Sequence, residues 1–434
     1  MTRQRVVIVG AGFAGLSAAR TLGNTPCEVL LVNRENYHTF VPLIHQVATC
    51  GLAPEHVVTS IRNLIRKYEN IKFITSEVNK INLTSQILEV NNYLIAYDYL
   101  ILACGSTSKF FGVPGAYEHC FTLKTLKDSV NIRNRILDCF EVGQEEARVS
   151  RQQQHLTFII VGGGATGVEI ASEVATLIYG TLIKDYPGLD FSRVRVLLLH
   201  SGERLLPDMP RHLSIYAVWQ LQRLGVDVQL NSRVIRVTEN AVHLEDSRVI
   251  PCHTVIWTAG VEGSPKLNQW GLLTNPNHQV KVLPTLQTLE YPQVYAVGDL
   301  ASPQNQQLPM LAPVAMQQGV TAANNILRQI KGKNPQPLRY QHQGSMLIIG
   351  RHAAVANLGK VTLTGFPAWL LWLVIHLVFL PGFSNRLHVL LCWGWIYFSH
   401  EHPVRLIFRQ DDAVKHQVNK YSHGAVKRWD GYEK

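Results

Sequence analysis

The strongest constraint on the fold of this 434-residue chain is a glycine motif that occurs twice. GAGFAG at residues 10–15 and GGGATG at residues 162–167 each follow an apolar run and open a helical stretch. In a strand–GxGxxG–helix unit the first glycine makes the tight turn, the second admits a pyrophosphate, and the third lets helix and strand pack closely. The sequence therefore predicts two dinucleotide sites, with the glycines Gly10, Gly12 and Gly15 in the first and Gly162, Gly164 and Gly167 in the second.

Strand-like apolar runs alternate with helical stretches along the chain, which is typical of α/β architecture. These runs lie at residues 6–9, 29–32, 99–103, 158–161, 194–199, 255–258 and 294–297. Each helix that follows a glycine motif offers free N–H groups and a positive dipole end to phosphates. Two such units would most naturally hold FAD and a nicotinamide nucleotide, as in flavin-dependent pyridine nucleotide oxidoreductases.

The acid that usually binds the ribose about 20 residues into such a unit is missing from both. Asn33 ends the run at 29–32, and its amide can still bond ribose hydroxyls as donor and acceptor. His200 ends the run at 194–199 and precedes Arg204. No carboxylate is present to repel a 2′-phosphate, and Arg204 or a charged His200 could attract one. The sequence is therefore compatible with either NADH or NADPH as the nucleotide.

Composition excludes several classes of protein. The chain has 41 Lys and Arg against 31 Asp and Glu, a formal charge of +10, with 46% hydrophobic and 17% charged residues. High apolar content without long charge blocks excludes disorder. Seven cysteines, an odd number with no CxxC pair, exclude a disulfide scaffold and a zinc ribbon, and we expect no metal site. The run at residues 6–9 is too short for a secretory signal, so we expect a reduced, intracellular chain.

The low charge content is concentrated in residues 366–398. Residues 368–380 are apolar apart from His376, and a second apolar run covers residues 387–398. The first run would span about 20 Å as a helix, short of the roughly 30 Å hydrocarbon core, so a single membrane span is not expected.

Aromatic and basic residues around these two runs favour a membrane surface. Of the eight tryptophans, Trp369, Trp372, Trp393 and Trp395 lie here, where interfacial anchoring would place them. Arg386, Arg405 and Arg409 could contact anionic head groups. We expect a helical hairpin lying in the membrane interface. The alternative is a buried helix pair that forms a dimer interface.

Several separated segments between residue 10 and about residue 409 carry a family resemblance. They are residues 33–49, 97–105, 257–261, 294–301, 312–319, 344–356 and 364–373. In these segments the chain resembles the type II NAD(P)H:quinone oxidoreductases, single-chain flavoproteins of the membrane surface. It departs from the family's usual Asp at Asn33, its Thr at Cys104, its Gln at Pro313 and its acid at His200.

The resemblance implies an α/β two-dinucleotide-binding flavoprotein fold with two Rossmann-type domains and a C-terminal membrane-associated helical region. Residues 1–150 and 263–340 would form the FAD-binding domain. Residues 151–262 would form the inserted NAD(P)H-binding domain, and residues 341–434 the membrane-anchoring region.

The resemblance also implies roles for cofactor-binding residues. Asp299 would bond the ribityl chain of the flavin; the alternative is a solvated turn residue. Gly105 and Gly260 lie in matching segments and would contact the cofactors.

Three further residues would carry the catalytic function. Glu169 would lie near flavin and nicotinamide; the alternative is a carboxylate stabilised by the helix dipole. Gln317 and Gln318 would line the quinone cavity, donating hydrogen bonds without placing a full charge there. The alternative for both is an ordinary polar position on a helix.

By resemblance, the reaction is hydride transfer from NADH or NADPH to non-covalent FAD, then two-electron reduction of a membrane quinone without proton pumping. The quinone could be ubiquinone, menaquinone, plastoquinone or a naphthoquinone. The protein would be a monotopic, homodimeric enzyme on a lipid bilayer surface, at the cytoplasmic face of the plasma membrane or another energy-transducing membrane. It would not bind nucleic acid.

Three alternatives remain at this stage. A specialised NADPH-dependent reductase of a demethylphylloquinone-type naphthoquinone is compatible with every motif. A flavin NADH oxidase or peroxidase could use Cys50, which lacks a CxxxxC partner, and sulfide:quinone chemistry would need paired cysteines. A flavoprotein binding module could use the +10 charge on nucleic acid, but this leaves the apolar C-terminal region unexplained.

Overall fold

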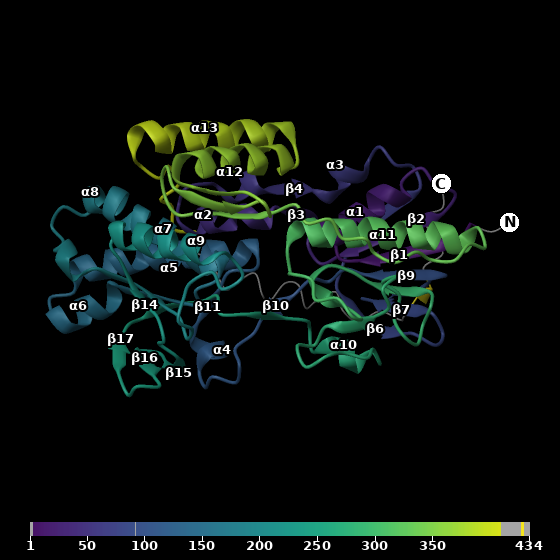
Figure 1. Cartoon of the computed structure of the whole chain (residues 1–434), viewed down its shortest axis with the longest axis horizontal. Helices are drawn as coiled ribbons and strands as arrows, with labels where there is room; N and C mark the ends of the chain where they lie inside the picture. The colour runs from purple at the N-terminus through teal and green to yellow at the C-terminus, as the bar shows by residue number, and fades with distance from the viewer. Residues whose placement is uncertain (1–2, 92, 409–426, 429–434) are drawn as a thin grey trace.

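The computed structural model describes residues 3–91, 93–408 and the backbone of 427–428 (Figure 1). Arg409, expected to contact lipid, lies outside the described residues, as does most of the chain after it. Two parallel sheets organise the molecule, and a pair of C-terminal helices lies along one side of it.

The first sheet has the strand order β21-β9-β1-β2-β5, and every neighbouring pair is parallel. Its strands are β1 (Arg5–Val9), β2 (Glu28–Asn33), β5 (Ile71–Thr75), β9 (Tyr99–Leu102) and β21 (Val294–Ala296). The chain leaves this sheet after β9 and returns to it only at β21. The apolar runs expected at residues 6–9, 29–32, 99–103 and 294–297 are all strands of this sheet.

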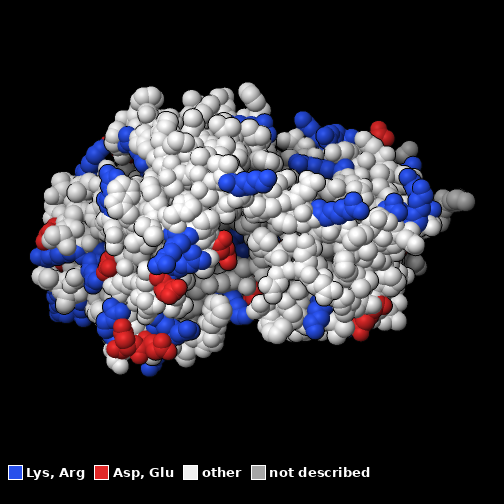
Figure 2. Space-filling model, viewed as in Figure 1, with Lys and Arg blue, Asp and Glu red and all other residues white. Residues whose placement is uncertain are grey.

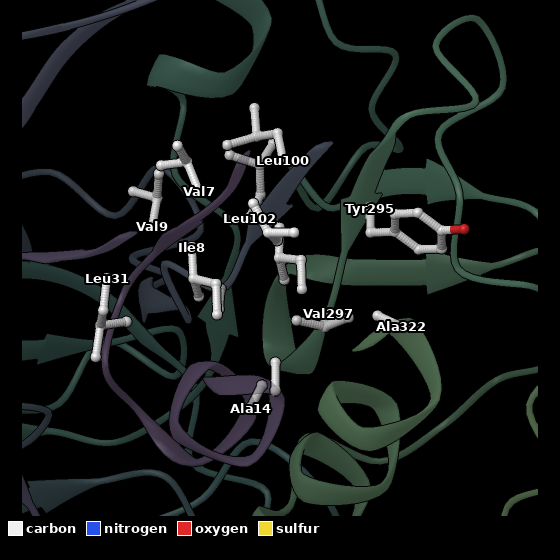
Figure 3. Packing of buried hydrophobic residues seen from close by; sticks show 14 of the residues in the cluster. Val7, Ile8, Val9, Ala14, Leu31, Leu100, Leu102, Tyr295, Val297 and Ala322 are labelled. Carbon is white, nitrogen blue, oxygen red and sulfur yellow. The ribbon is translucent and has the colours of Figure 1, made fainter. Parts of the chain in front are cut away.

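Two helices, α1 (Phe13–Leu22) and α11 (Ala312–Ile330), pack together on one face of the first sheet. A Cβ on Gly319 would lie 2.1 Å from the carbonyl oxygen of Ala14, so α11 needs a glycine to approach α1 this closely. Figure 3 shows the core between sheet and helices, with Val7, Ile8, Val9, Ala14, Leu31, Leu100, Leu102, Tyr295, Val297 and Ala322 labelled.

The second sheet has the order β11-β18-β12-β13-β14 and is also parallel. Its strands are β11 (Phe121–Thr122), β12 (Thr157–Val161), β13 (Arg195–Leu199), β14 (Val226–Gln229) and β18 (Thr254–Trp257). Its principal helices are α5 (Leu126–Glu145), α7 (Ala165–Leu177) and α9 (Arg211–Arg223). A short antiparallel ribbon of β10 (Thr107–Ser108) and β19 (Val261–Glu262) lies where the chain passes between the sheets.

The C-terminal part begins with a three-stranded sheet, β23 (Ser345–Ile348), β24 (Ala354–Asn357) and β25 (Thr362–Thr364). A helical hairpin follows, α12 (Gly365–Phe379) and α13 (Phe383–Ser399), as the two apolar runs predict. Trp372 and Trp393 of the hairpin are buried against the body of the protein. Within the described ranges, no helix is both long and apolar enough to cross a membrane.

The remaining elements are short. The helices are η1 (Val41–Leu43), α2 (Ile44–Ala48), η2 (Pro54–Val57), α3 (Ile61–Ile65), α4 (Ala116–His119), α6 (Val149–His155), η3 (Ile178–Leu182), α8 (Ile183–Asp185), η4 (Phe191–Arg193), α10 (Lys266–Gln269) and η5 (Gly298–Leu300). The strands are β3 (Tyr37–Thr39), β4 (Val58–Ser60), β6 (Val78–Asn82), β7 (Ile87–Val90), β8 (Tyr93–Ala96), β15 (Val234–Thr238), β16 (Ala241–Leu244), β17 (Val249–Pro251), β20 (Val280–Val282), β22 (Ala301–Pro303) and β26 (Lys427–Arg428).

Candidate active site

The first and third glycines of each motif are required by the backbone itself. Gly10 has φ +105°, and a Cβ there would lie 2.3 Å from the carbonyl oxygen of Ala103. A Cβ on Gly15 would lie 1.8 Å from the carbonyl oxygen of Gly10. The second motif repeats this, because a Cβ on Gly167 would lie 1.8 Å from the carbonyl oxygen of Gly162, which has φ +118°. These glycines therefore let each turn fold against its own helix and the neighbouring strand.

The middle glycines have no such packing role. At Gly12 and at Gly164, no atom of the described residues lies within 4 Å of the position that a Cβ would take. Each is the N-cap of its helix, α1 or α7. Open space at a helix N-terminus, at the carboxyl end of a parallel strand, is where a pyrophosphate binds. The residues present therefore fit a dinucleotide at both turns.

Asn33 and His200 bind the glycine turns rather than pointing away from them. The Asn33 Oδ1 atom accepts a hydrogen bond of 2.9 Å from the backbone N–H of Ala11, and its Nδ2 donates to the Glu35 carbonyl at 2.7 Å. The His200 Nδ1 atom accepts from the backbone N–H of Gly163 at 3.2 Å. Burial lowers the pKa of His200, so its ring is neutral near pH 7. A neutral ring carries no charge to attract a 2′-phosphate, and a role of His200 in nucleotide binding stays a prediction.

The Gly-Asp turn after β21 is held by residues from three other segments. The Asp299 Oδ2 atom accepts a hydrogen bond of 2.7 Å from the Ser106 hydroxyl, which in turn accepts one of 2.8 Å from Lys124 Nζ. Lys124 Nζ lies 4.0 Å from Asp299 Oδ2, and burial lowers its pKa. On the other side, Gln318 Oε1 accepts from the backbone N–H of Gly298 at 2.5 Å. No sequence pattern pointed to Ser106 or Lys124.

Glu169, on α7, is a carboxyl whose side chain is 15% exposed, and no Lys or Arg of the described residues forms an ion pair with it. Its Oε2 atom lies 3.9 Å from His45 Nδ1, and its Oε1 atom lies 3.4 Å from the backbone N–H of Ile348. Burial raises the pKa of Glu169 to about 8 and lowers the pKa of His45 to about 4. At pH 7 the two groups therefore meet as neutral species, not as an ion pair. A raised pKa also argues against a carboxylate whose charge is stabilised mainly by the helix dipole.

The two glutamines expected to share a quinone cavity bind different parts of the protein. Gln318 is buried behind Gly298, with its Oε1 occupied. Gln317 makes a reciprocal pair with the backbone of Gln341, since its Nε2 donates to the carbonyl and its Oε1 accepts from the N–H, both at 2.9 Å. Among the described residues no hydrogen bond joins either glutamine to Glu169.

Gly105 and Gly260 have different environments. Gly105 has φ +71° and faces open space, next to Ser106. A Cβ on Gly260 would lie 2.7 Å from the ring of Phe111, so the ring packs where any larger residue would place its side chain. Phe111 is 59% exposed and has φ +52°, which is unusual for a bulky residue. Phe111 was not predicted, because its contact with Gly260 depends on the ribbon of β10 and β19.

A hollow of about 50 Å³ lies between the hairpin and the body of the protein. Its lining combines polar residues of the body with aromatic residues of the hairpin, among them Gln46, Glu173, His402, Trp369, Trp393 and Tyr397. The Glu173 Oε2 atom lies 3.8 Å from His402 Nε2, and Trp393 Nε1 donates to Gln46 Oε1 at 2.8 Å. The hollow thus joins an apolar, aromatic wall to a small set of hydrogen-bonding groups.

Cys50 does not have the environment of a redox thiol. Its side chain is fully buried, and burial raises its pKa to about 12. The thiolate is the reactive form of cysteine, so the structure does not favour the single-cysteine oxidase alternative. Within the described ranges no group of three or more His, Cys, Asp or Glu side chains is placed to hold a metal ion.

Two parallel sheets, each with a dinucleotide-binding glycine turn, define a pyridine nucleotide oxidoreductase. The family model described as pyridine nucleotide-disulphide oxidoreductase matches residues 4–319. The type II NADH:quinone oxidoreductase Ndh of Mycobacterium tuberculosis is 35% identical over 412 residues, which cover 92% of this chain and 89% of that protein. The type II enzyme of Haemophilus influenzae is 29% identical over 397 residues, covering 83% and 89%. The chain belongs to the type II NADH:quinone oxidoreductases, and the resemblance seen in the sequence is confirmed.

Solved structures agree with this fold. The structure of NDH2 from Plasmodium falciparum in complex with NADH has a TM-score of 0.87 at 20% identity, covering 94% of this chain and 100% of that one. The sulfide:quinone oxidoreductase of Aquifex aeolicus has a TM-score of 0.70 at 17% identity, covering 89% and 92%. At these identities the likeness concerns the fold alone. It confirms the predicted α/β fold with C-terminal helices.

Proposed function

We propose that this chain binds one non-covalent FAD and uses NADH or NADPH to reduce a quinone at a membrane surface. When bound, the FAD would accept a hydride from the nucleotide and deliver two electrons to the quinone. The observation that carries the proposal is the pair of open glycine turns at Gly12 and Gly164, one on each parallel sheet. NADH and quinone are named as substrates of its type II relatives.

The proposal assigns the cofactors to separate parts of the chain. The first sheet and its helices, within residues 1–150 and 263–340, would hold FAD, with the turn at Gly12 facing the pyrophosphate and Asp299 facing the ribityl hydroxyls. Within the same range, β11 and α5 belong to the second sheet. Residues 151–262 would hold the nucleotide at Gly164. Support comes from Asp299, whose Oδ2 is fixed by Ser106 while the turn itself is anchored by Gln318. A fixed carboxylate is already oriented when the ligand arrives.

Glu169 would supply a proton for quinone reduction. Reducing a quinone to a quinol consumes two electrons and two protons, and only one proton equivalent arrives with the hydride. Because its pKa is raised to about 8, the Glu169 carboxyl still holds its proton at pH 7 and can donate it to a quinone oxygen. The hollow beneath the hairpin lies next to this carboxyl, since Ile348, whose backbone N–H bonds Glu169, is one of its lining residues.

Half-reactions measured without oxygen test this proposal. The purified protein should release FAD on denaturation, NADH or NADPH should bleach its flavin absorbance, and a quinone should restore it. Gln317→Ala should slow the quinone step while leaving the nucleotide step largely intact. A flavin that neither nucleotide reduces would contradict the function, and equal slowing of both steps would contradict the role of Gln317. A panel of benzoquinones and naphthoquinones then separates a general quinone reductase from a specialised naphthoquinone reductase.

We further propose that the hairpin binds the lipid bilayer surface. Figure 2 shows few Lys, Arg, Asp or Glu side chains over α12 and α13 on this face. Leu391 is 63% exposed and Phe398 is 81% exposed on α13, whereas Trp372 and Trp393 face the body. One side of the hairpin therefore packs on the protein and the other presents apolar side chains, as in an interfacial anchor. A homodimer through this region stays a prediction.

Leu391→Glu combined with Phe398→Glu should release the protein from lipid vesicles. Two charges on the outer face remove the gain from burying apolar area, about 1.5–3 kcal/mol per side chain. Turnover of a short, water-soluble quinone should persist. Val149→Glu, at a 56% exposed position on α6, is the matched control and should sediment with vesicles as the unmodified protein does. Vesicle binding by the double variant would refute the anchor. Deleting the whole hairpin is less informative, because the pockets of Trp372 and Trp393 would be left open.

A further inference from the structure

A large hollow lies beside the loop that follows β13. Its volume is about 630 Å³. Glu203 and Arg204 line it from that loop, Leu230 from the residue after β14, and Arg211 and Trp219 from α9. Figure 2 shows Lys and Arg side chains gathered near the position of α9, next to acidic ones. The hollow therefore begins at the carboxyl ends of β13 and β14, where an open α/β sheet binds its ligand.

Two arginines line this hollow, and they differ in their contacts with the rest of the protein. The guanidinium of Arg204 donates to the backbone carbonyls of Pro207 and Met209, so it is committed to holding the loop. Arg211 is exposed, and its side chain has no hydrogen bond or ion pair in the described part of the chain. Because a guanidinium binds phosphate oxygens through two parallel N–H groups, a free arginine in a hollow suits a phosphate.

The position of the hollow indicates which phosphate. In a Rossmann-type unit the adenosine ribose lies at the end of the second strand, here β13, and an acid there selects NADH by binding the 2′-hydroxyl. His200 takes that place as a neutral ring bound to Gly163. The lining of the hollow includes the carboxylate of Glu203, which is exposed. A 2′-phosphate at the end of β13 would thus meet no fixed acid and would have Arg211 on the adjoining helix.

We propose that Arg211 binds the 2′-phosphate of NADPH, so that this chain oxidises NADPH at least as efficiently as NADH. This inference rests on the proposed function, because it refines the nucleotide that the second glycine turn would hold. Arg211 acts on specificity only and takes no part in the chemical step. A hydrogen-bonded arginine–phosphate pair contributes about 10- to 100-fold in affinity.

Binding of two nucleotide fragments tests the proposal without turnover. By calorimetry, the unmodified protein should bind 2′,5′-ADP at least 10-fold more tightly than 5′-ADP. Arg211→Gln should remove most of this difference while leaving the affinity for 5′-ADP unchanged. Arg223→Gln is the matched control: it removes a cation from the same helix, but Arg223 stacks on Trp219 at 4.6 Å and is not part of the hollow's lining. Glu203→Gln should keep or increase the preference for 2′,5′-ADP.

The outcomes separate this inference from the function on which it rests. Equal affinity of the unmodified protein for the two fragments, or an unchanged preference in Arg211→Gln, overturns the assignment of Arg211. If NADH still bleaches the flavin in that case, the proposed function stands. If neither nucleotide bleaches the flavin but Arg211→Gln abolishes the preference for 2′,5′-ADP, the 2′-phosphate site stands and the proposed reaction fails.

Discussion

Gly15→Ala is expected to yield a protein that no longer retains flavin, and Gly167→Ala one that retains flavin but is not reduced by nucleotide. In each case the new Cβ would lie 1.8 Å from a carbonyl oxygen of the same glycine turn, that of Gly10 or Gly162. Neither atom is at the end of a flexible side chain, so the turn itself must move. An overpacking cost of about 3 kcal/mol corresponds to roughly a hundredfold loss of affinity at that site. Flavin content per chain and nucleotide titration of flavin absorbance measure the two effects.

The middle glycines supply the matched controls. Gly12→Ala and Gly164→Ala place a Cβ where no described atom lies within 4 Å, so both variants should unfold at nearly the temperature of the unmodified protein. Their ligand affinity should still fall, because the added methyl group occupies the approach of the pyrophosphate. Suppose that Gly15→Ala kept its flavin while Gly12→Ala lost stability. That result would refute the view that the first and third glycines are needed for packing and the middle glycine for access of the ligand.

Glu169→Gln is expected to lower quinone reduction about 100-fold near pH 7. Because burial raises the pKa of Glu169 to about 8, the unmodified enzyme should lose quinone reduction as pH rises through 8 and the carboxyl ionises. The amide cannot titrate, so the variant should lack that loss. Reduction of the flavin by nucleotide should change far less. Glu118→Gln, at an exposed position of α4, is the control and should keep the dependence on pH near 8.

Thermal unfolding provides a second test of Glu169 that does not depend on turnover. The pKa of Glu169 is higher in the folded protein than its unfolded value of about 4.5. The contribution of this carboxyl to stability is therefore fully present below about pH 4.5. This stabilisation is lost as pH rises towards and through 8. Glutamine removes the dependence, so the unfolding temperature of the variant relative to the unmodified protein should rise between about pH 4.5 and 8 and then level off. A constant difference over that range would show that the carboxyl is not held neutral.

The parts of the fold that were predicted correctly are those with a local cause. A glycine turn between a strand and a helix is specified by consecutive residues, because the turn needs φ values and close contacts that only glycine allows. The same holds for the hairpin, where Pro381 and Gly382 interrupt two apolar runs and the structure ends α12 at Phe379. For these features neighbouring residues alone contain the necessary information.

The surroundings of the site could not be predicted in this way. Asp299 is fixed by Ser106 and Lys124, and Glu169 meets His45, in each case from a distant part of the sequence. The raised pKa of Glu169 arises from burial, which only the assembled fold creates. These contacts depend on how the two sheets and α2 pack together, and the spacing of residues in the sequence does not predict that arrangement.

Asn33 and His200 make contacts that the sequence did not predict, for a different reason. Both were correctly placed at the ends of strands, but their side chains were expected to face a ribose or a phosphate. In the structure each accepts a hydrogen bond from the second residue of its own glycine turn, Ala11 or Gly163. A backbone N–H within reach competes with an outside ligand for the same acceptor. The sequence identifies the position of such a residue but not which of these partners it takes.

The late return of the chain to its first sheet has a consequence for biosynthesis. β9 ends at Leu102, but its neighbour β21 begins only at Val294, and α11, which packs on α1, follows after that. During synthesis the second sheet, from β11 to β18, is complete while one edge of β9 still lacks its partner. Such long-range pairing is slow, and an unpaired strand edge invites association with other chains. We therefore expect flavin uptake to be a late step, and nascent chains stalled before residue 294 to depend on chaperones.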